Sequence, residues 1–111
     1  MSEPKHLYVI GPVTGKKNRN EAAFEEARRK LEAAGYEVTT PLDLIPESTS
    51  WEAAMRWSVR AIVNNGYSGV AMIDGWEESK GAKLECVVSL TIGVPAHPVE
   101  FWLLVKEASD D

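Results

Sequence analysis

The amino-acid sequence predicts an α/β fold, a three-layer flavodoxin- or Rossmann-like parallel sheet of four to five strands with helices on both faces. Short apolar runs alternate along the chain with longer segments whose apolar residues recur at helical spacing. Such runs are typical of strands that are covered on both faces, and their alternation with helices implies right-handed crossovers between parallel strands. The chain has the length of one domain with its own core, so we expect residues 1–111 to form a single domain.

The first strand is predicted over residues 6–10, an aromatic and β-branched run. Residues 15–20 are polar and predict a loop. A helix over residues 21–34 follows, with Asn20 as its N-cap and Gly35 at its C-terminal end. The inner face of this helix is defined by apolar residues at helical spacing, namely Ala23, Phe24, Ala27, Leu31 and Ala34.

The middle of the chain predicts a second strand and a second helix. Residues 36–40 alternate in polarity like a strand, and residues 41–50, which include two prolines, predict a loop. Ser50 is the expected N-cap of a helix over residues 51–63. The apolar face of this helix comprises Trp51, Ala54, Met55, Val59, Ile62 and Val63.

The last part of the chain predicts one further helix and the remaining strands. Residues 69–73 predict the third strand, and residues 79–92 predict the third helix. A short fourth strand is expected within residues 93–99. Residues 101–105 fit either a fifth strand or a terminal helix.

In open parallel sheets, ligands bind beyond the carboxyl ends of the strands, at the switch in strand order. The loops that follow the first and third strands are therefore where we expect the functional site. The candidate binding residues in these loops are Gly11, Pro12, Thr14 and Gly15 after the first strand, and Asp74, Gly75 and Trp76 after the third.

The first of these loops, GPVTGKKNRN, combines glycines, a threonine hydroxyl and the cations Lys16, Lys17 and Arg19 just before a helix. Backbone N–H groups and the helix dipole suit such a place to a phosphate or a carboxylate. The loop is neither a Walker loop nor a GxGxxG fingerprint, and a solvated basic turn remains the alternative interpretation.

The second loop leads into a helix that begins near Ser79 and carries Glu85 in its second turn. Gly81 and Ala82 lie on the same side of this helix as Glu85, and their small size would let a flat ligand approach. We expect Trp76 to cover such a ligand. The sequence thus predicts a binding site that includes Ser79, Gly81 and Ala82.

The two carboxylates of this region, Asp74 and Glu85, allow two interpretations. A carboxylate on a buried helical turn is either paired structurally or functional. Lys80 and Lys83 are the candidate structural partners. Both interpretations remain open at the level of the sequence.

Composition excludes several classes of function. The net charge of −5 argues against a nucleic-acid polymer or an anionic membrane as partner. The one cysteine, Cys86, stands among apolar residues and is expected to be a buried structural thiol. His6 and His97 have no metal-ligand spacing, so we expect no metal, and nothing implies an organic cofactor. No signal-peptide pattern occurs and no apolar run reaches the ~18 residues of a membrane span, so a cytoplasmic protein is expected.

Four stretches of the sequence form a recognisable pattern in this order: "YVIGPVTG", "NRNEAAFEEA", "AAGYEVTTP" and "GWEESKGAKLE". Together they resemble the nucleoside 2-deoxyribosyltransferase-like superfamily, and within it the small phage-type family. The resemblance covers residues 7 to about 99. It implies a flavodoxin-like fold and an activity that cleaves or exchanges the N-glycosidic bond of deoxynucleosides or their 5′-monophosphates.

The same resemblance implies roles for individual residues. Glu85 matches the catalytic glutamate that attacks the anomeric carbon of the deoxyribose, and Tyr8 is assigned to catalysis beside it. Tyr8 and Gly11 match first-strand residues that lie under the sugar and base. The residues that match the loop lining the sugar and any 5′-phosphate are Ser79, Gly81 and Ala82. At Ser58, which we assign to substrate binding, relatives carry an aspartate; a serine can hydrogen-bond but cannot act as an acid near neutral pH.

Three functions therefore remain open. The first is an N-deoxyribosyltransferase or N-glycosidase, and the second is a non-catalytic protein that binds a nucleoside or nucleotide. The third is an interaction domain that forms a homodimer through exposed tryptophans and the segment "FWLLV". Trp51 and Trp57 cannot share one helix face, so we expect one in the core and the other at an interface. Relatives often form their sites at subunit contacts, so we expect a homo-oligomer.

Overall fold

The structure is a computed structural model that describes residues 5–109, with the side chains of residues 5–106. Its elements in chain order are β1 (His6–Ile10), η1 (Lys17–Asn20), α1 (Glu21–Ala33), β2 (Glu37–Thr39), α2 (Pro41–Leu44), α3 (Trp51–Asn64), β3 (Gly69–Met72), η2 (Trp76–Glu78), α4 (Lys80–Thr91), β4 (Ala96–Pro98) and α5 (Val99–Ser109). No helix within this part of the chain is long and apolar enough to cross a membrane.

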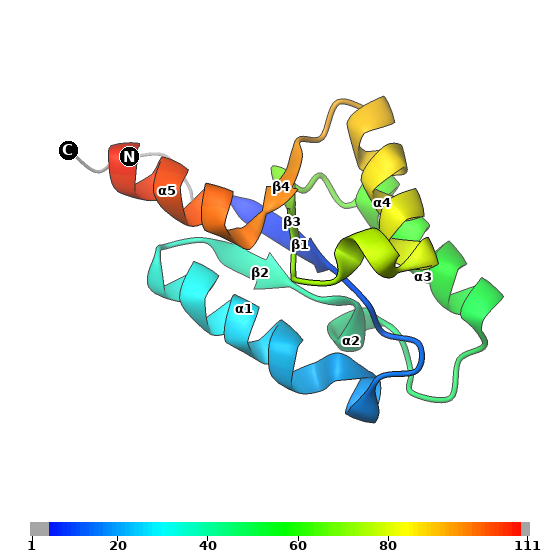
Figure 1. Cartoon of the computed structure of the whole chain (residues 1–111). Helices are drawn as coiled ribbons and strands as arrows, with labels where there is room; N and C mark the ends of the chain where they lie inside the picture. The colour runs from blue at the N-terminus through cyan, green and yellow to red at the C-terminus, as the bar shows by residue number, and fades with distance from the viewer. Residues whose placement is uncertain (1–4, 110–111) are drawn as a thin grey trace.

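The four strands form one parallel sheet in the order β2-β1-β3-β4. Helices α1 and α5 cover one face of the sheet, and α3 and α4 cover the other (Figure 1). This arrangement confirms the predicted three-layer α/β fold, with four strands. The strand order switches direction between β1 and β3, because β2 lies on one side of β1 while β3 and β4 lie on the other. Open parallel sheets bind their ligands at such a switch.

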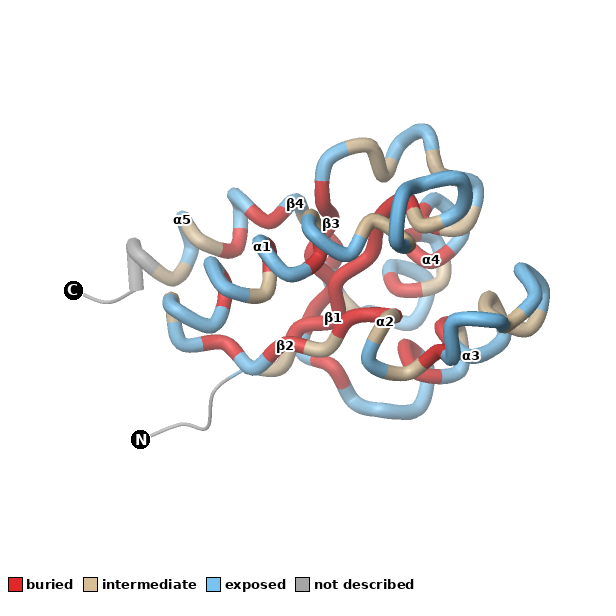
Figure 2. Tube along the Cα trace, turned by 90° about the horizontal axis from the view of Figure 1, so that it is seen from below, coloured by how far each residue is buried: buried red, intermediate tan, exposed pale blue. Residues whose placement is uncertain are grey.

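The core is divided between the two faces of the sheet because side chains alternate along each strand. On β1, Leu7 and Val9 pack with α1 and α5, whereas Tyr8 and Ile10 pack with α3 and α4. All four side chains are fully buried, and Figure 2 shows the buried residues concentrated along the central strands. Tyr8 therefore places a phenol in the layer between the sheet and the α3/α4 pair.

Several helix boundaries lie where local residues in the sequence predict them. Ser50 Oγ accepts a hydrogen bond from the N–H of Ala53 at 3.3 Å, and Ser79 Oγ accepts one from the N–H of Ala82 at 3.1 Å. These caps start α3 and α4 at the predicted positions. Gly35, with φ +101°, follows the end of α1, where only glycine adopts the left-handed backbone at little cost.

Asn20 occupies the predicted N-cap position of α1, but its side chain makes no capping hydrogen bond. Its Nδ2 donates to the carbonyl oxygen of Pro12 at 3.0 Å. The reason lies in the preceding backbone: Asn18, Arg19 and Asn20 are all left-handed, with φ of 50°, 56° and 61°. This conformation, which asparagine tolerates better than most residues, joins η1 directly to α1 and turns the Asn20 side chain back toward the loop.

Two further segments bear on the predictions: one predicted loop is partly helical, and one segment that fitted either a strand or a helix is a helix. Residues 41–50 were expected to be loop, but Pro41–Leu44 forms the one-turn helix α2. Proline suits the first turn of a helix, where its missing N–H is not needed, and the N–H of Thr40 donates to Asp43 Oδ2 at 2.9 Å. Residues 101–105 belong to α5 and are helical, not a fifth strand.

The exposed tryptophans of α3 do not divide between core and interface as expected. Trp51 is 38% exposed and Trp57 is 46% exposed, so neither belongs to the core. The helix instead packs Ser58 and Ile62 toward the sheet. The buried tryptophan is Trp102 on α5, whose Nε1 donates to the carbonyl oxygen of Val70 at 2.9 Å.

Candidate functional site

A cavity of about 360 Å³ lies at the carboxyl edge of the sheet, on the side covered by α3 and α4. Its volume falls in the ~300–1,000 Å³ range of small-molecule sites. Four segments line it: the loop after β1 (residues 11–20, called the β1 loop below), α2 with the turn that follows it, the first half of α3, and the first half of α4. The cavity therefore occupies the switch in strand order where a site was expected.

Glu85 is the buried charged group of the cavity lining, with only 6% of its surface exposed. It lies in the second turn of α4, three residues after the buried Ala82, so both side chains point toward the sheet. The Ser79 cap fixes the start of this helix and hence the direction of the Glu85 side chain. Burying a carboxyl group is costly unless it is hydrogen-bonded, so its partners decide its chemistry.

A chain of hydroxyl groups leads from β1 to Glu85. Ser58 Oγ donates a hydrogen bond to Glu85 Oε2, and Tyr8 Oη lies 2.7 Å from Ser58 Oγ. A serine hydroxyl has one proton to donate, so Tyr8 donates to Ser58 while Ser58 donates to Glu85. Within the described residues Glu85 has no other hydrogen-bond partner, which leaves its Oε1 available to a ligand in the cavity.

The ionisation of these groups follows from their burial. Burial raises the pKa of Glu85 to about 7, against the opposing effect of the hydrogen bond from Ser58. Burial, and next the negative charge of Glu85, raise the pKa of Tyr8 above its ordinary value, so the phenol stays protonated. Near neutral pH, Glu85 thus exchanges between the acid and the carboxylate while Tyr8 remains a donor.

The β1 loop contributes the lining residues Gly11, Val13, Thr14, Gly15, Lys16 and Arg19. Gly11 has a packing reason to be glycine, because an added Cβ would lie 2.2 Å from Cγ1 of Ile73. Gly15 has φ +79° and lets the chain turn over the cavity. Gly11 thus packs against Ile73, which follows β3, and also lines the cavity, while Thr14 and Gly15 line the cavity.

The segment after β2 forms a wall of the cavity that was not predicted from the sequence. Ile45, Pro46 and Glu47 line the cavity, and Arg19 Nη1 donates to the carbonyl oxygen of Ile45 at 2.8 Å. This bond joins the β1 loop to the segment after β2. The available signal was topological: β2 is parallel to β1 and beside it, so its following loop must lie at the same edge of the sheet.

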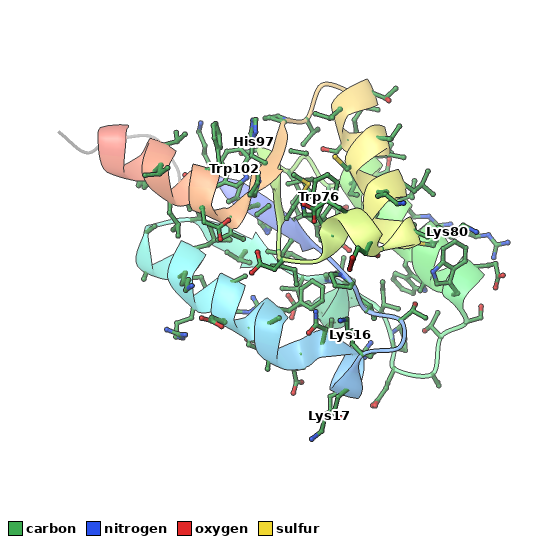
Figure 3. All side chains as sticks on the ribbon, viewed as in Figure 1. Lys16, Lys17, Trp76, Lys80, His97 and Trp102 are labelled. Carbon is green, nitrogen blue, oxygen red and sulfur yellow. The ribbon has the colours of Figure 1, made fainter. Side chains whose placement is uncertain are left out.

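The first halves of α3 and α4 approach closely at the cavity. An added Cβ at Gly81 would lie 3.0 Å from Sδ of Met55, so the glycine permits this approach. Lys80 Nζ lies 5.1 Å from the centre of the Trp51 ring, a cation–π contact at the end of α4 that Figure 3 shows near α3. Lys80 therefore contacts Trp51 and, among the described residues, forms no ion pair with Glu85.

Several residues predicted for the site do not line the cavity themselves. Tyr8 reaches it only through Ser58. Pro12 and Gly75 lie against each other, since an added Cβ at Gly75 would be 3.3 Å from Cγ of Pro12. Trp76 packs against the core under α4 (Figure 3), and Asp74 is exposed. The loop after β3 thus positions the β1 loop and α4 without contacting the cavity.

The two histidines and the cysteine, which could in principle support metal or thiol chemistry, do not line the cavity. In the part of the chain that the structure describes, no group of three or more His, Cys, Asp and Glu side chains could hold a metal ion. His6 Nε2 bonds to Thr39 Oγ1 at 2.6 Å, and His97 stacks on Phe101. Cys86 is buried, which raises the pKa of its thiol, as expected for a structural residue.

The fold and the cavity define a flavodoxin-like α/β protein with a buried carboxyl group in a site of small-molecule size. The chain belongs to the family described as "Domain of unknown function (DUF4406)", which matches residues 5–97. A comparison with curated proteins finds no match.

Proposed function

We propose that the protein cleaves or exchanges the N-glycosidic bond of a deoxynucleoside or a deoxynucleoside 5′-monophosphate, with Glu85 as the nucleophile. The observation that carries this proposal is the arrangement of the Glu85 carboxyl group. One oxygen is held by Ser58, and the other has no partner among the described residues in a cavity at the switch in strand order. A buried carboxyl group with a free oxygen suits covalent chemistry better than a structural ion pair.

The resemblance of residues 7 to about 99 to nucleoside 2-deoxyribosyltransferase-like proteins supports the same assignment. It assigns the nucleophile to Glu85 from the sequence alone, and Glu85 is the buried carboxyl group of the cavity lining. Three residues that the resemblance assigns to the sugar loop, Ser79, Gly81 and Ala82, line the same cavity.

In the first step, Oε1 of the ionised Glu85 attacks the anomeric carbon of the deoxyribose. The bond from this carbon to the base nitrogen breaks, and its electron pair leaves with the base, which takes up a proton. The product is a glycosyl ester of Glu85, as in retaining glycosidases. Ser58 donates to Oε2 during the attack and Tyr8 donates to Ser58, so this chain of hydroxyl groups stabilises the ionised carboxylate.

In the second step, water or an incoming base attacks the same carbon and releases the Glu85 carboxylate. The attacking group loses a proton, which balances the proton taken up by the leaving base. Hydrolysis yields the free sugar, and attack by a second base yields an exchanged nucleoside. Glu47 is the other carboxyl group of the lining and is the available side chain of this type for proton transfer to the base.

One observation favours a second candidate function, non-catalytic binding of a nucleoside or nucleotide. Ser58 stands where related sequences carry an aspartate, so the buried part of the cavity holds one carboxyl group and not two. A protein with this arrangement would bind the ligand through the same lining without breaking the glycosidic bond.

The test is to incubate the protein with each deoxynucleoside and each 5′-monophosphate and to measure free base by chromatography. We expect release from at least one substrate, and a loss on the order of 1,000-fold or more in Glu85→Gln, because the amide cannot attack. Glu78→Gln, an exposed residue outside the cavity, is the matched control and should keep full activity. Ligand binding without release from any substrate would instead establish the non-catalytic function.

A further inference from the structure

Cationic side chains enter the cavity from one segment, the β1 loop. Among the described residues that line the cavity, Lys16 and Arg19 are the positively charged ones, and Glu47 and Glu85 are the negatively charged ones. The two cations belong to the loop after β1, whereas the carboxyl groups come from α4 and from the turn after α2. The positive charges of the cavity lining therefore come from one loop and the negative charges from other segments, although the whole protein carries a net charge of −5.

Neither cation is neutralised by a residue that the structure describes. Within the described residues, Lys16 and Arg19 form no ion pair, whereas Arg28 pairs with Glu25, Glu32 and Asp43. Arg19 uses one guanidinium donor, Nη1, on the carbonyl oxygen of Ile45 and keeps its other N–H groups available. Unpaired cations beside a cavity in an acidic protein indicate an anionic ligand.

The backbone holds these cations in place at an energetic cost. Gly15 and residues 18–20 have left-handed φ values on either side of Lys16. Left-handed backbone at a residue such as Arg19 costs on the order of 1 kcal/mol and persists where surrounding contacts impose it. The bond from Arg19 to Ile45 and the bond from Asn20 to Pro12 are those contacts. The loop is thus preorganised before a ligand arrives.

The burial of the charged groups indicates how a ligand would be oriented in the cavity. Glu85 is buried and Arg19 is half-buried, whereas Lys16 and Glu47 are exposed, so the cations lie nearer the solvent than Glu85. A ligand with an electrophilic carbon at Glu85 would extend its anionic end toward the β1 loop. Apolar groups of Ile45, Pro46 and Trp51 belong to the same lining.

We propose that the ligand of this cavity is a phosphate monoester, the 5′-monophosphate of a deoxynucleoside, and that Lys16 and Arg19 bind its phosphate group. The inference rests on the proposed function for the identity of the sugar and base. A phosphate monoester carries close to two negative charges and three terminal oxygens, which matches one ammonium and one guanidinium group. The hydroxyl group of Thr14, beside Lys16 in the lining, supplies a further donor.

The test compares kcat/KM for base release from matched pairs of deoxynucleosides and their 5′-monophosphates. Lys16→Ala should lower kcat/KM for the monophosphate by roughly tenfold or more, because it removes one charge-assisted contact, and should leave the unphosphorylated deoxynucleoside within about twofold. Lys17→Ala is the matched control, because Lys17 points away from the body of the protein and does not line the cavity (Figure 3). Equal kcat/KM for both members of each pair in the wild type, unchanged in Lys16→Ala, would overturn the inference while leaving the proposed function intact.

Binding measurements separate this inference from the proposed function. In Glu85→Gln, calorimetry should show that a deoxynucleoside 5′-monophosphate binds more tightly than its deoxynucleoside, with an affinity that falls with added salt and with Lys16→Ala. The same binding in the wild-type protein, without base release from any substrate, would support the phosphate site and reject the proposed catalysis. Deoxyribose 5-phosphate and inorganic phosphate, used as separate probes, show whether the base is needed. Absence of Lys16-dependent binding for all three phosphate probes would overturn the inference.

Discussion

On the α1/α5 face of the sheet, two polar side chains buried with the core donate to main-chain carbonyl oxygens: Tyr36 Oη donates to Trp102 and Trp102 Nε1 to Val70. On the α3/α4 face, a buried carboxyl group stands at the end of the hydroxyl chain from Tyr8 through Ser58. Both faces are built on alternate side chains of the same strand, β1. The difference teaches that one face serves stability, while the other retains a polar group whose burial is costly.

The cations of the two regions differ in the same way. On α1, Arg28 donates to Glu25 and Asp43 and lies beside Glu32. Burial raises the pKa of Asp43, but the hydrogen bonds from Arg28 and Thr40 and the charge of Arg28 together outweigh burial, so the pKa lies below its ordinary value. At the cavity, Lys16 and Arg19 have no such partner among the described residues. Arg28 on α1 is thus neutralised by neighbouring carboxylates, whereas the two cations of the cavity lining are unpaired among the described residues.

The largest expected effect on stability comes from the α1/α5 face. Phe24 is fully buried in the core between α1 and the sheet, so Phe24→Ala should lower the free energy of unfolding by about 3–5 kcal/mol. Chemical denaturation measures this loss. If the comparison between the faces is right, the folded fraction of this variant keeps the kcat/KM of the wild type. A folded but inactive Phe24→Ala protein would show that the two faces are coupled.

The next effect is a dependence of stability on pH that originates at Glu85. Its pKa is about 7 in the folded protein and 4.5 ordinarily, so between these values the unfolded chain loses a proton that the folded protein keeps. Stability therefore falls as pH rises through this range, by about 3 kcal/mol in total. Denaturation curves from pH 4.5 to 8 should show this decline relative to Glu85→Gln, which lacks the ionising group. Parallel curves for the two proteins would contradict the burial of an ionisable Glu85.

The smallest expected effect is that of Ser58→Ala on the pH dependence of activity, which tests whether Ser58 has more than a structural role. Ser58→Ala removes the hydrogen bond that lowers the pKa of Glu85, so the rise of kcat/KM with pH should move from about 7 to higher values. Activity near neutral pH should fall by roughly tenfold, since fewer molecules carry the ionised nucleophile. Ser89→Ala is the matched control: Ser89 is buried on the same helix as Glu85, donates to the carbonyl oxygen of Val94 at 2.7 Å, and does not line the cavity. Identical pH profiles for both serine variants would reject the role of Ser58.

The fold was predictable because local signals and global pattern agree in this chain. The apolar run of β1, the Ser50 and Ser79 caps and Gly35 each specify a boundary that the structure forms. The errors came where one residue type serves two structures. Proline at position 41 ends a strand and equally begins α2, and Asn20 suits a cap and equally a left-handed turn.

The site was predictable in part, for a reason that is geometric. The positions of Glu85, Gly81 and Ser79 on one helix follow from helical spacing, so their approach to a common cavity could be foreseen. The contact of Ser58 with Glu85 joins residues 27 positions apart, and local pattern does not specify it. The wall formed by Ile45 and Pro46 likewise depends on strand order, which fixes which loops share an edge.

The central claim, that Glu85 is the nucleophile of the cavity, is tested most directly by trapping the glycosyl ester. The protein is incubated with a deoxynucleoside or 5′-monophosphate that carries fluorine at the 2′ carbon, which slows breakdown of the ester, and is analysed by intact-mass and peptide mass spectrometry. We predict a sugar adduct on the peptide that contains Glu85, absent in Glu85→Gln. Release of free base with the adduct on another residue, or at an undiminished rate in Glu85→Gln, would contradict the account.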